Sequence, residues 1–329
     1  MKSHIFRAAA LTMALLAAVA APALAQNHVE GSFARMLNVT GTVDVEVTTG
    51  SGSITVRPGS GDRVAITGKI RASVNMSQSR SEAEEKVKRL ESQPPIEQSG
   101  NVIRIGRIED RDLQRNVSIS YELVVPATTK LRSRTGSGSQ TVEGIEGPLE
   151  AGTGSGSIEV SSIAGDVRAE TGSGGITLRA VRGAVRAGTG SGSIRANGVG
   201  GPFTATTGSG SVEAEINTAG DVEVRTGSGG IRLNGVRGAL RASTGSGSIS
   251  AEGEPRGDWR VSTSSGSITA RLPAEAGFEL RARTSSGSIT TSHPVTVEGT
   301  IGRREIRGKV RAGGPLVDLS TASGNIRIE

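Results

Sequence analysis

The amino-acid sequence predicts an all-β fold, a parallel β-solenoid with about 18 residues per coil and one short α-helix inserted in its N-terminal part. Three observations predict it: a motif of the form TGSGSI recurs along the chain, its copies keep a fixed spacing, and aromatic residues are almost absent. The same motif also looks like a glycine-rich phosphate-binding loop. Each copy is therefore either a phosphate-binding site or a structural turn of the repeat.

The copies of the motif follow one another at regular intervals. Between Thr135 and Thr263 the spacing is 18 or 19 residues throughout. A fixed period of this size is typical of repeat proteins, in which each unit buries its apolar face only against its neighbours. The copies begin at Thr49, Thr135, Thr153, Thr171, Thr189, Thr207, Thr226, Thr244, Thr263, Thr284 and Thr321.

Each period contains two half-repeats, such as GAVRAG (Gly183 to Gly188) followed by TGSGSIRAN (Thr189 to Asn197). Each half offers a glycine, an apolar residue and then alternation, which is typical of a short strand. Two strands and two tight turns fit one coil, which stacks on the next at roughly 4.8 Å. An antiparallel sandwich of hairpins is the alternative, because GSG also forms hairpin turns. Identical residues at an invariant period favour the solenoid.

The N-terminal part of the chain departs from this repeat. The segment SEAEEKVKRLES (Ser81 to Ser92) predicts a helix that starts with a capping box at Ser81 and Glu84 and covers the open edge of the first coils. We therefore expect a signal peptide at 1–25, an N-terminal β-rich part at 26–130 with its helix at 81–92, and the repeat β-solenoid at 131–329.

The first 25 residues have the layout of a secretory signal peptide. Lys2 and Arg7 precede an apolar run, and Ala23-Leu24-Ala25 predicts cleavage after Ala25. We expect an exported protein of the periplasm, the cell surface or the extracellular space, with no transmembrane segment in the mature chain. The absence of cysteine excludes disulfides, thiolate zinc sites and cysteine nucleophiles.

Sites for catalysis, cofactors or metals are not predicted. A phosphate loop feeds a helix N-terminus, whereas each motif here precedes a strand and no lysine follows it. Calcium-binding β-rolls need an aspartate in the turn, and the motif has Ser or Gly there. We expect His293 to be a surface histidine and Glu159, Glu213 and Glu223 to be solvated. The chain is therefore not predicted to be an enzyme.

One register position carries a partial basic stripe. Arg168, Arg186, Arg241 and Arg260 share it, with Thr204 and Glu223 interrupting. Stacked coils would align these side chains, so the stripe is a candidate contact for an anionic polymer or lipid surface, and solubility is the alternative role. The expected partners are cell-envelope polymers, anionic glycans or surface proteins, and nucleic acid is not among them.

Several segments resemble a known family. The helix SEAEEKVKRL, the strand SYELVVPATTKLRSRTGSGS, the repeated TGSGSI units and the closing GGPLVDLSTASGNIRIE resemble the bacterial putative-adhesin family of β-strand-repeat envelope proteins, also called domain of unknown function 4097. The resemblance implies a right-handed β-solenoid, no established enzymatic activity and a role in surface attachment. The stretch IGRREIRGKV, between Thr290 and Gly314, departs from the repeat and leaves the local coil count open.

The leading hypothesis is a secreted, non-catalytic β-solenoid of the bacterial cell envelope that serves as an adhesion or structural module. The alternatives are a polysaccharide-active lyase or hydrolase on a β-helix scaffold, which would need a groove with paired carboxylates beside an aromatic residue, and an accessory protein of the envelope stress response. The last strand, Ile326 to Glu329, is expected to be exposed at the end of the rod.

Overall fold

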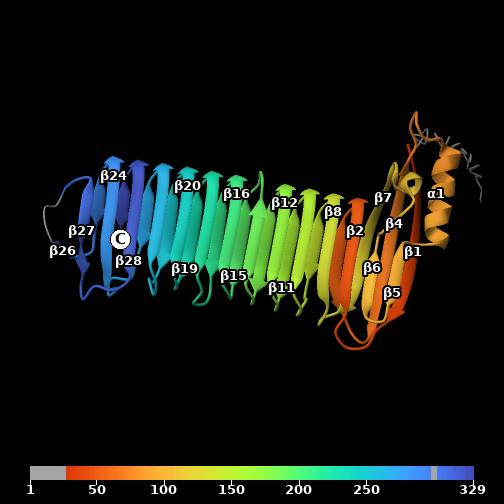
Figure 1. Ribbon diagram of the computed structural model, residues 1–329, viewed down its shortest axis with the longest axis horizontal. Coiled ribbons are helices and arrows are strands. Elements are labelled where there is room, and N and C mark those ends of the chain that lie inside the picture. The colour runs from red at the N-terminus through yellow and green to blue at the C-terminus, as the bar shows by residue number, and fades with distance from the viewer. Residues whose placement is uncertain (1–26, 298–301) are drawn as a thin grey trace, which may run out of the picture.

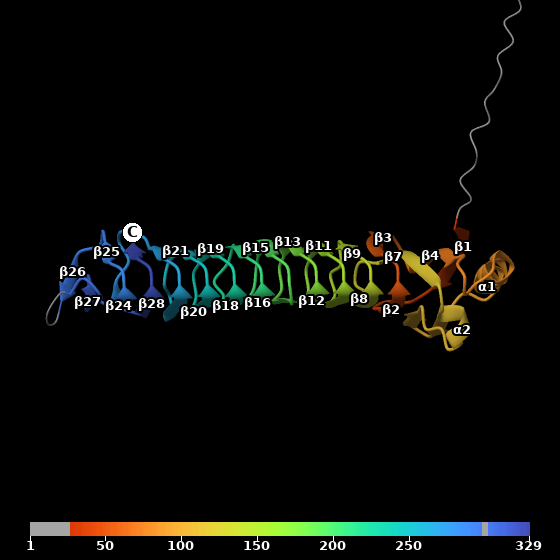
Figure 2. The same ribbon diagram turned by 90° about the horizontal axis from the view of Figure 1, so that it is seen from above.

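Two long β-sheets face each other along the whole length of the molecule. The computed structural model describes residues 27–297 and 302–329. In Figure 1 the strands stand side by side across a long rod, and in Figure 2 the same rod is seen from above, with its two sheets as separate layers. The predicted signal peptide lies outside the described residues. Within the described ranges, none of the helices has the length and apolar character needed to cross a membrane.

We call the 14-stranded sheet sheet A and the 15-stranded sheet sheet B. In spatial order, sheet A contains β1 (His28–Asn38), β4 (Arg63–Ser73), β7 (Val117–Pro126), β3 (Ile54–Gly59), β9 (Gln140–Glu143), β11 (Ile158–Ile163), β13 (Ile176–Val181), β15 (Ile194–Val199), β17 (Val212–Ile216), β19 (Ile231–Val236), β21 (Ile249–Gly253), β23 (Ile268–Arg271), β29 (Ile326–Ile328) and β25 (Ile289–Thr291). Sheet B contains β26 (Val295–Val297), β27 (Glu305–Val310), β24 (Phe278–Ser286), β28 (Leu316–Ser323), β22 (Trp259–Ser265), β20 (Leu240–Ser246), β18 (Val222–Ser228), β16 (Phe203–Ser209), β14 (Val185–Thr189), β12 (Val167–Ser173), β10 (Leu149–Ser155), β8 (Lys130–Ser137), β2 (Asp44–Ser51), β6 (Val102–Ile105) and β5 (Ile96–Ser99).

From β8 to β23 the chain alternates strictly between the two sheets, so that each strand pairs in parallel with its equivalent in the next repeat. Leu149 pairs with Val167 in sheet B, and Ile158 pairs with Ile176 in sheet A. Equivalent residues of neighbouring repeats therefore stack on one another. This parallel pairing excludes the antiparallel sandwich of hairpins for this part of the chain.

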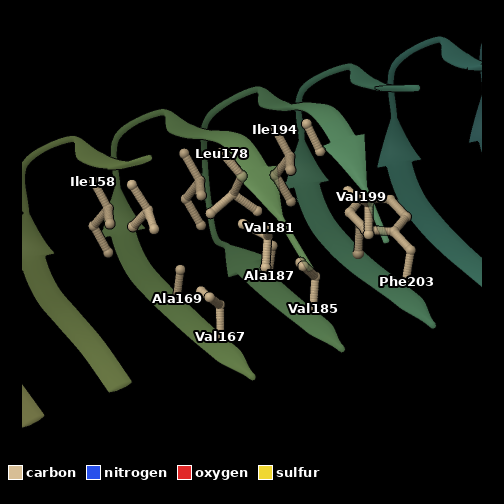
Figure 3. Close-up of a cluster of buried hydrophobic side chains, with 14 of the residues drawn as sticks. Ile158, Val167, Ala169, Leu178, Val181, Val185, Ala187, Ile194, Val199 and Phe203 are labelled. Atoms are coloured by element: carbon tan, nitrogen blue, oxygen red, sulfur yellow. The ribbon is translucent and has the colours of Figure 1, made fainter. Parts of the chain in front are cut away.

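The core is a thin layer between the two sheets. Alternate residues of each strand point inward, and the inward position that follows the large apolar residue is often alanine, as at Ala169 and Ala187 (Figure 3). Larger side chains such as Phe203 and Trp259 are also completely buried. The small partner residues let the sheets approach closely, which explains why so few aromatic residues are needed.

The N-terminal end closes the rod with antiparallel strands and a helix. β1 pairs with β4, and β4 pairs with β7, both in antiparallel fashion. The helix α1 (Arg80–Ser92) packs against β1 and β4 and buries Ala83, Val87 and Leu90. The helix covers the terminal strands with this apolar face. Figure 2 shows α1 at the end of the rod.

The position of the helix cap differs from the prediction. The capping box is formed by Ser79 and Glu82, whereas the sequence pattern predicts it at Ser81 and Glu84. The backbone N–H of Ser79 donates to Glu82 Oε2 at 2.7 Å, and the backbone N–H of Glu82 donates to Ser79 Oγ at 3.3 Å. Ser79 with Glu82 and Ser81 with Glu84 both fit the Ser-x-x-Glu pattern. The N-cap residue is Ser79, because its backbone is extended and not helical. A further short helix, α2 (Arg111–Gln114), was not predicted.

The C-terminal end contains an exchange in strand order. β28 and β29 form the last coil in sequence, yet β28 lies between β22 and β24, and β29 lies between β23 and β25. The expectation of an exposed last strand is therefore wrong, because Ile326 and Ile328 are completely buried. Instead, β26 and β27 add an antiparallel pair beyond β24, so Glu305 to Val310 of the departing stretch close the end of sheet B.

Candidate functional site

In the turns from Thr135 to Thr263, the threonine of each TGSGSI-type motif is buried and hydrogen-bonds to the preceding coil. Thr189 Oγ1 donates to the carbonyl of Gly174 at 2.9 Å, and Thr207 Oγ1 donates to that of Gly192 at 2.8 Å. These hydroxyl groups face the interior, and a strand rather than a helix follows each turn, so the turns do not form phosphate cradles. The same bond joins Thr153 to Gly138, Thr171 to Gly156, Thr226 to Gly210, Thr244 to Gly229 and Thr263 to Gly247.

The four arginines of the predicted stripe lie on the outer face of sheet B. Arg168 on β12 is the register partner of Arg186 on β14, and Arg241 on β20 is that of Arg260 on β22. All four side chains are exposed. Thr204 and Glu223 occupy the two positions between the pairs, so the stripe consists of two separated basic pairs.

Ion pairs with neighbouring carboxylates reduce the charge available on this stripe. Arg168 Nη2 lies 2.6 Å from Glu170 Oε1, and Arg260 Nη2 lies 3.1 Å from Asp258 Oδ2. Arg186 and Arg241 take part in none of the ion pairs within the described ranges. Arg186 and Arg241 thus each carry a charge without an ion-pair partner in the described ranges. They lie three strands apart in sheet B.

A shallow groove runs along the starts of the sheet B strands at one end of the stripe. Its volume is about 420 Å³, and its lining includes Arg132, Arg168 and Arg186 together with Glu150 and Asp166. Apolar atoms of Leu149, Val167 and Pro202 form its floor and rim. The groove therefore offers cationic groups beside an apolar surface, but it also contains carboxylates.

Glu150 is held by two arginines at this groove. Arg132 Nε lies 3.0 Å from Glu150 Oε2, and Arg134 Nη2 lies 2.8 Å from Glu150 Oε1. The hydrogen bonds from Arg132 and then Arg134 lower the pKa of Glu150 below its ordinary value. The carboxylate is therefore ionised and already paired, which suits a structural ion pair and not a general acid.

The residues considered for catalysis do not assemble into a site. Glu213 lies 3.6 Å from Arg232 Nη1, and Glu223 lies 2.5 Å from Arg225 Nη2, each as a surface ion pair. The side chains that could stack on a sugar, Trp259 and Tyr121, are both buried. In the described part of the chain, His, Asp and Glu form no cluster that could hold a metal ion.

His293 is not the surface histidine that the sequence predicts. It is only 7% exposed and packs edge-on against Phe278, with ring centroids 5.5 Å apart. His293 follows the last strand of sheet A and Phe278 begins β24, so the pair belongs to the core at the C-terminal end. The prediction failed because the segment around this histidine lacks the repeat that marks inward positions elsewhere.

Another set of charged residues could not be grouped from the sequence. Arg281 on β24 lies opposite Arg307 on β27, and the flanking pairs of these antiparallel strands join Arg283 to Glu305 and Glu279 to Lys309. Periodicity could not place them together, because β27 lies outside the repeat. The available signal was local charge, since IGRREIRGKV contains four basic residues and one acidic residue.

Comparisons with known proteins identify one family over part of the chain. Residues 183–329 match the Toastrack family, domain of unknown function 4097, which confirms the resemblance for that segment. No curated protein matches the chain. Among solved structures, a putative cell adhesion protein from Clostridium sporogenes is 13% identical, with 91% of this chain and 98% of that chain covered and a TM-score of 0.21. A putative adhesin from Bacteroides fragilis is 15% identical, with 74% and 97% covered and a TM-score of 0.30.

Proposed function

We propose that the protein is an exported, non-catalytic β-solenoid of the bacterial cell envelope that acts as an adhesion or structural binding module. The proposal includes a right-handed coil of about 18 residues, supported by the stacking of residues such as Leu149 on Val167. It also includes export to the periplasm, the cell surface or the extracellular space, supported by the signal-peptide pattern before Gln26.

One observation carries the proposal: regular, exposed rows of side chains run along both sheets, whereas Glu213 and Glu223 are held in surface ion pairs and Trp259 and Tyr121 are buried. An extended flank of this kind suits an extended partner, because each added coil repeats the contact at roughly 4.8 Å. The polysaccharide-active enzyme has no comparable support, since Trp259 and Tyr121 are buried and inaccessible to a sugar.

The arginine stripe is the part of this flank that we propose for contact with an anionic envelope polymer. Arg186 and Arg241 are the members that carry uncompensated charge in the described part of the chain, and Arg186 also lines the groove of about 420 Å³. Arginine suits anionic groups because its planar guanidinium donates two parallel hydrogen bonds.

The test is retention of fractionated envelope components by the immobilised protein. We expect at least one polymer fraction to be retained and its retention to fall with rising salt, because exposed charges are screened. The variant R168E/R186E/R241E/R260E should no longer retain that fraction. A matched variant on sheet A, R179E/R195E/R232E/R271E, makes the same charge change on exposed positions of the opposite face and should keep it.

Two results would count against the proposal. If the unmodified protein retains none of the fractions, the adhesion role is wrong. If the stripe variant and the sheet A variant bind alike, the protein is a binding module whose contact lies elsewhere, and the stripe serves only solubility.

A further inference from the structure

A strongly basic segment lies near the C-terminus of the chain. After the predicted cleavage site the chain has 36 basic and 32 acidic residues. The segment 279–311 has seven basic and three acidic residues, a net charge of +4, and the segment 171–212 reaches the same net charge with four arginines and no acidic residue.

The fold brings this charge together at the C-terminal end of sheet B. β24 and β27 pair in antiparallel fashion, with Arg281 opposite Arg307 and Arg283 opposite Glu305. Like charges directly opposite each other destabilise a sheet. Arg281 also faces Asp318 on β28, and Arg307 is ion-paired with Glu305, so this like-charged pair is partly compensated.

A hollow of about 520 Å³ lies beside this pairing, over the ends of β22, β28 and β24. Arg283 and Arg304 line it, together with Ser285, Ser320 and Glu305. The backbone N–H of Thr284 donates to the carbonyl of Arg304 at 2.9 Å, which fixes the chain of Arg304 next to β24.

The charges that line this hollow are unequally compensated. Glu305 is held by Arg307, whose Nε lies 2.8 Å and whose Nη2 lies 2.7 Å from Glu305 Oε1. Arg283 and Arg304, in contrast, take part in none of the ion pairs of residues 27–297 and 302–329. The one carboxylate of the hollow is thus already neutralised, and two guanidinium groups are left beside the hydroxyl groups of Ser285 and Ser320.

We propose that this hollow binds an oxyanion of the phosphate type, with Arg283 and Arg304 as its main ligands. Two planar guanidinium groups can each donate paired hydrogen bonds to a tetrahedral anion, and serine hydroxyls can donate to its remaining oxygens. The phosphate group is common to free phosphate and to an anionic lipid headgroup. The site stands on its own geometry and does not depend on the adhesion role or on the arginine stripe.

The proposal is tested with the full protein and two probes. Inorganic phosphate is titrated at pH 7 and followed by calorimetry, and vesicles of phosphatidylglycerol are compared with vesicles of phosphatidylcholine by co-sedimentation. We expect binding of phosphate, of phosphatidylglycerol vesicles or of both. The variant R283Q/R304Q should weaken it, by roughly tenfold for each charge-assisted hydrogen bond that the substitution removes.

Two further variants serve as controls. R179Q/R195Q removes the same charge from exposed positions of sheet A and should change binding by less than about twofold, because single exposed charges at that distance are screened. R283K/R304K keeps the charge but removes the guanidinium fork, so its binding should be intermediate.

The two probes distinguish a phosphate ligand from a lipid headgroup. Phosphate binding without vesicle binding supports the site with a soluble or polymer-borne phosphate, and vesicle binding that depends on Arg283 and Arg304 supports a lipid headgroup. The proposal is overturned if neither probe binds, or if R179Q/R195Q weakens binding as much as R283Q/R304Q. Circular dichroism of each variant shows that the fold is retained before binding is compared.

Discussion

The second glycine of each TGSGSI-type turn lies so close to the preceding coil that no side chain fits there. A Cβ atom at Gly192 would collide with the backbone carbonyl of Gly174, and one at Gly174 would collide with that of Gly156. The sequence pattern by itself suggests that these glycines serve tight turning of the chain. At Gly174 and Gly192, whose φ is not positive, the reason is instead the close approach of backbones from one coil to the next.

Substitution of Gly192 tests this explanation. We expect G192A to lower the free energy of unfolding by about 1–3 kcal/mol, because the coils must separate to admit the methyl group. Urea unfolding followed by circular dichroism measures the effect. G188A is the matched control in the same coil, since its Cβ would meet only the Glu170 side chain at 3.8 Å. Equal losses of stability in the two variants would contradict the steric explanation.

The buried threonine of the turn contributes through one hydrogen bond. Thr207 is 2% exposed and donates to Gly192, so T207V would leave that carbonyl without its partner. We expect a loss of about 1–2 kcal/mol in the free energy of unfolding. Thr206 is the neighbouring outward residue, and T206V should be close to neutral. A neutral T207V would show that the threonine ladder does not stabilise the rod.

At the scale of elements, the helix α1 depends on the cap at Ser79. We expect S79A to destabilise the first turn of the helix by about 1 kcal/mol, because the N-terminal amides lose their acceptor. Amide hydrogen exchange in the first turn of α1 measures this locally. S81A should have a much smaller effect, since Ser81 is inside the helix. If S81A destabilised the first turn more than S79A, the N-cap residue would be Ser81.

The same cap predicts a dependence on pH. The hydrogen bond from the Ser79 backbone lowers the pKa of Glu82 below its ordinary value of about 4.5. The ionised carboxylate therefore stabilises the folded helix above that value, and this contribution is lost as pH falls through the lowered pKa. Protection of the α1 amides should differ between the unmodified protein and E82A at pH 7 and converge in acid. A difference that persists in acid would exclude the carboxylate as its source.

How far the elements could be predicted depended on the repeat. The motif from Thr135 to Thr263 predicted the stacked strands, because register follows directly when identical residues recur at one period. The stripe of Arg168 and Arg186 could be placed for the same reason. Arg304 could not, because it directly precedes β27, a strand that pairs in antiparallel fashion and lies outside the repeat. The capping box at Ser79 failed for another reason: Ser79 and Ser81 fit the same pattern equally well.

At the scale of the whole molecule, the order of the coils is a property that the period does not specify. The turns at Thr263, Thr284 and Thr321 have nearly the same sequence, so each could stack on either of the others. The structure places Thr321 between the other two: it donates to the carbonyl of Gly266, and Thr284 donates to that of Gly324. A long connection from β25 to β28, with β26 and β27 across the end, makes this order possible.

The central claim is that in-register parallel coils build the rod and that the last coil is inserted between two earlier ones. Disulfide formation tests it directly, because the chain has no cysteine of its own. Ser323 is the register partner of both Ser265 and Ser286, whereas Ser265 and Ser286 are separated by β28. Neighbouring strands lie about 4.8 Å apart, within the reach of a disulfide, and next-nearest strands lie beyond it.

The measurement is the yield of crosslinked protein after mild oxidation of three double variants. The account predicts efficient crosslinking in S265C/S323C and in S286C/S323C, and none in S265C/S286C. Efficient crosslinking in S265C/S286C together with failure in S265C/S323C would mean that the coils stack in the order of the sequence, which would contradict the inserted coil. Failure of all three pairs would contradict the in-register parallel stacking itself.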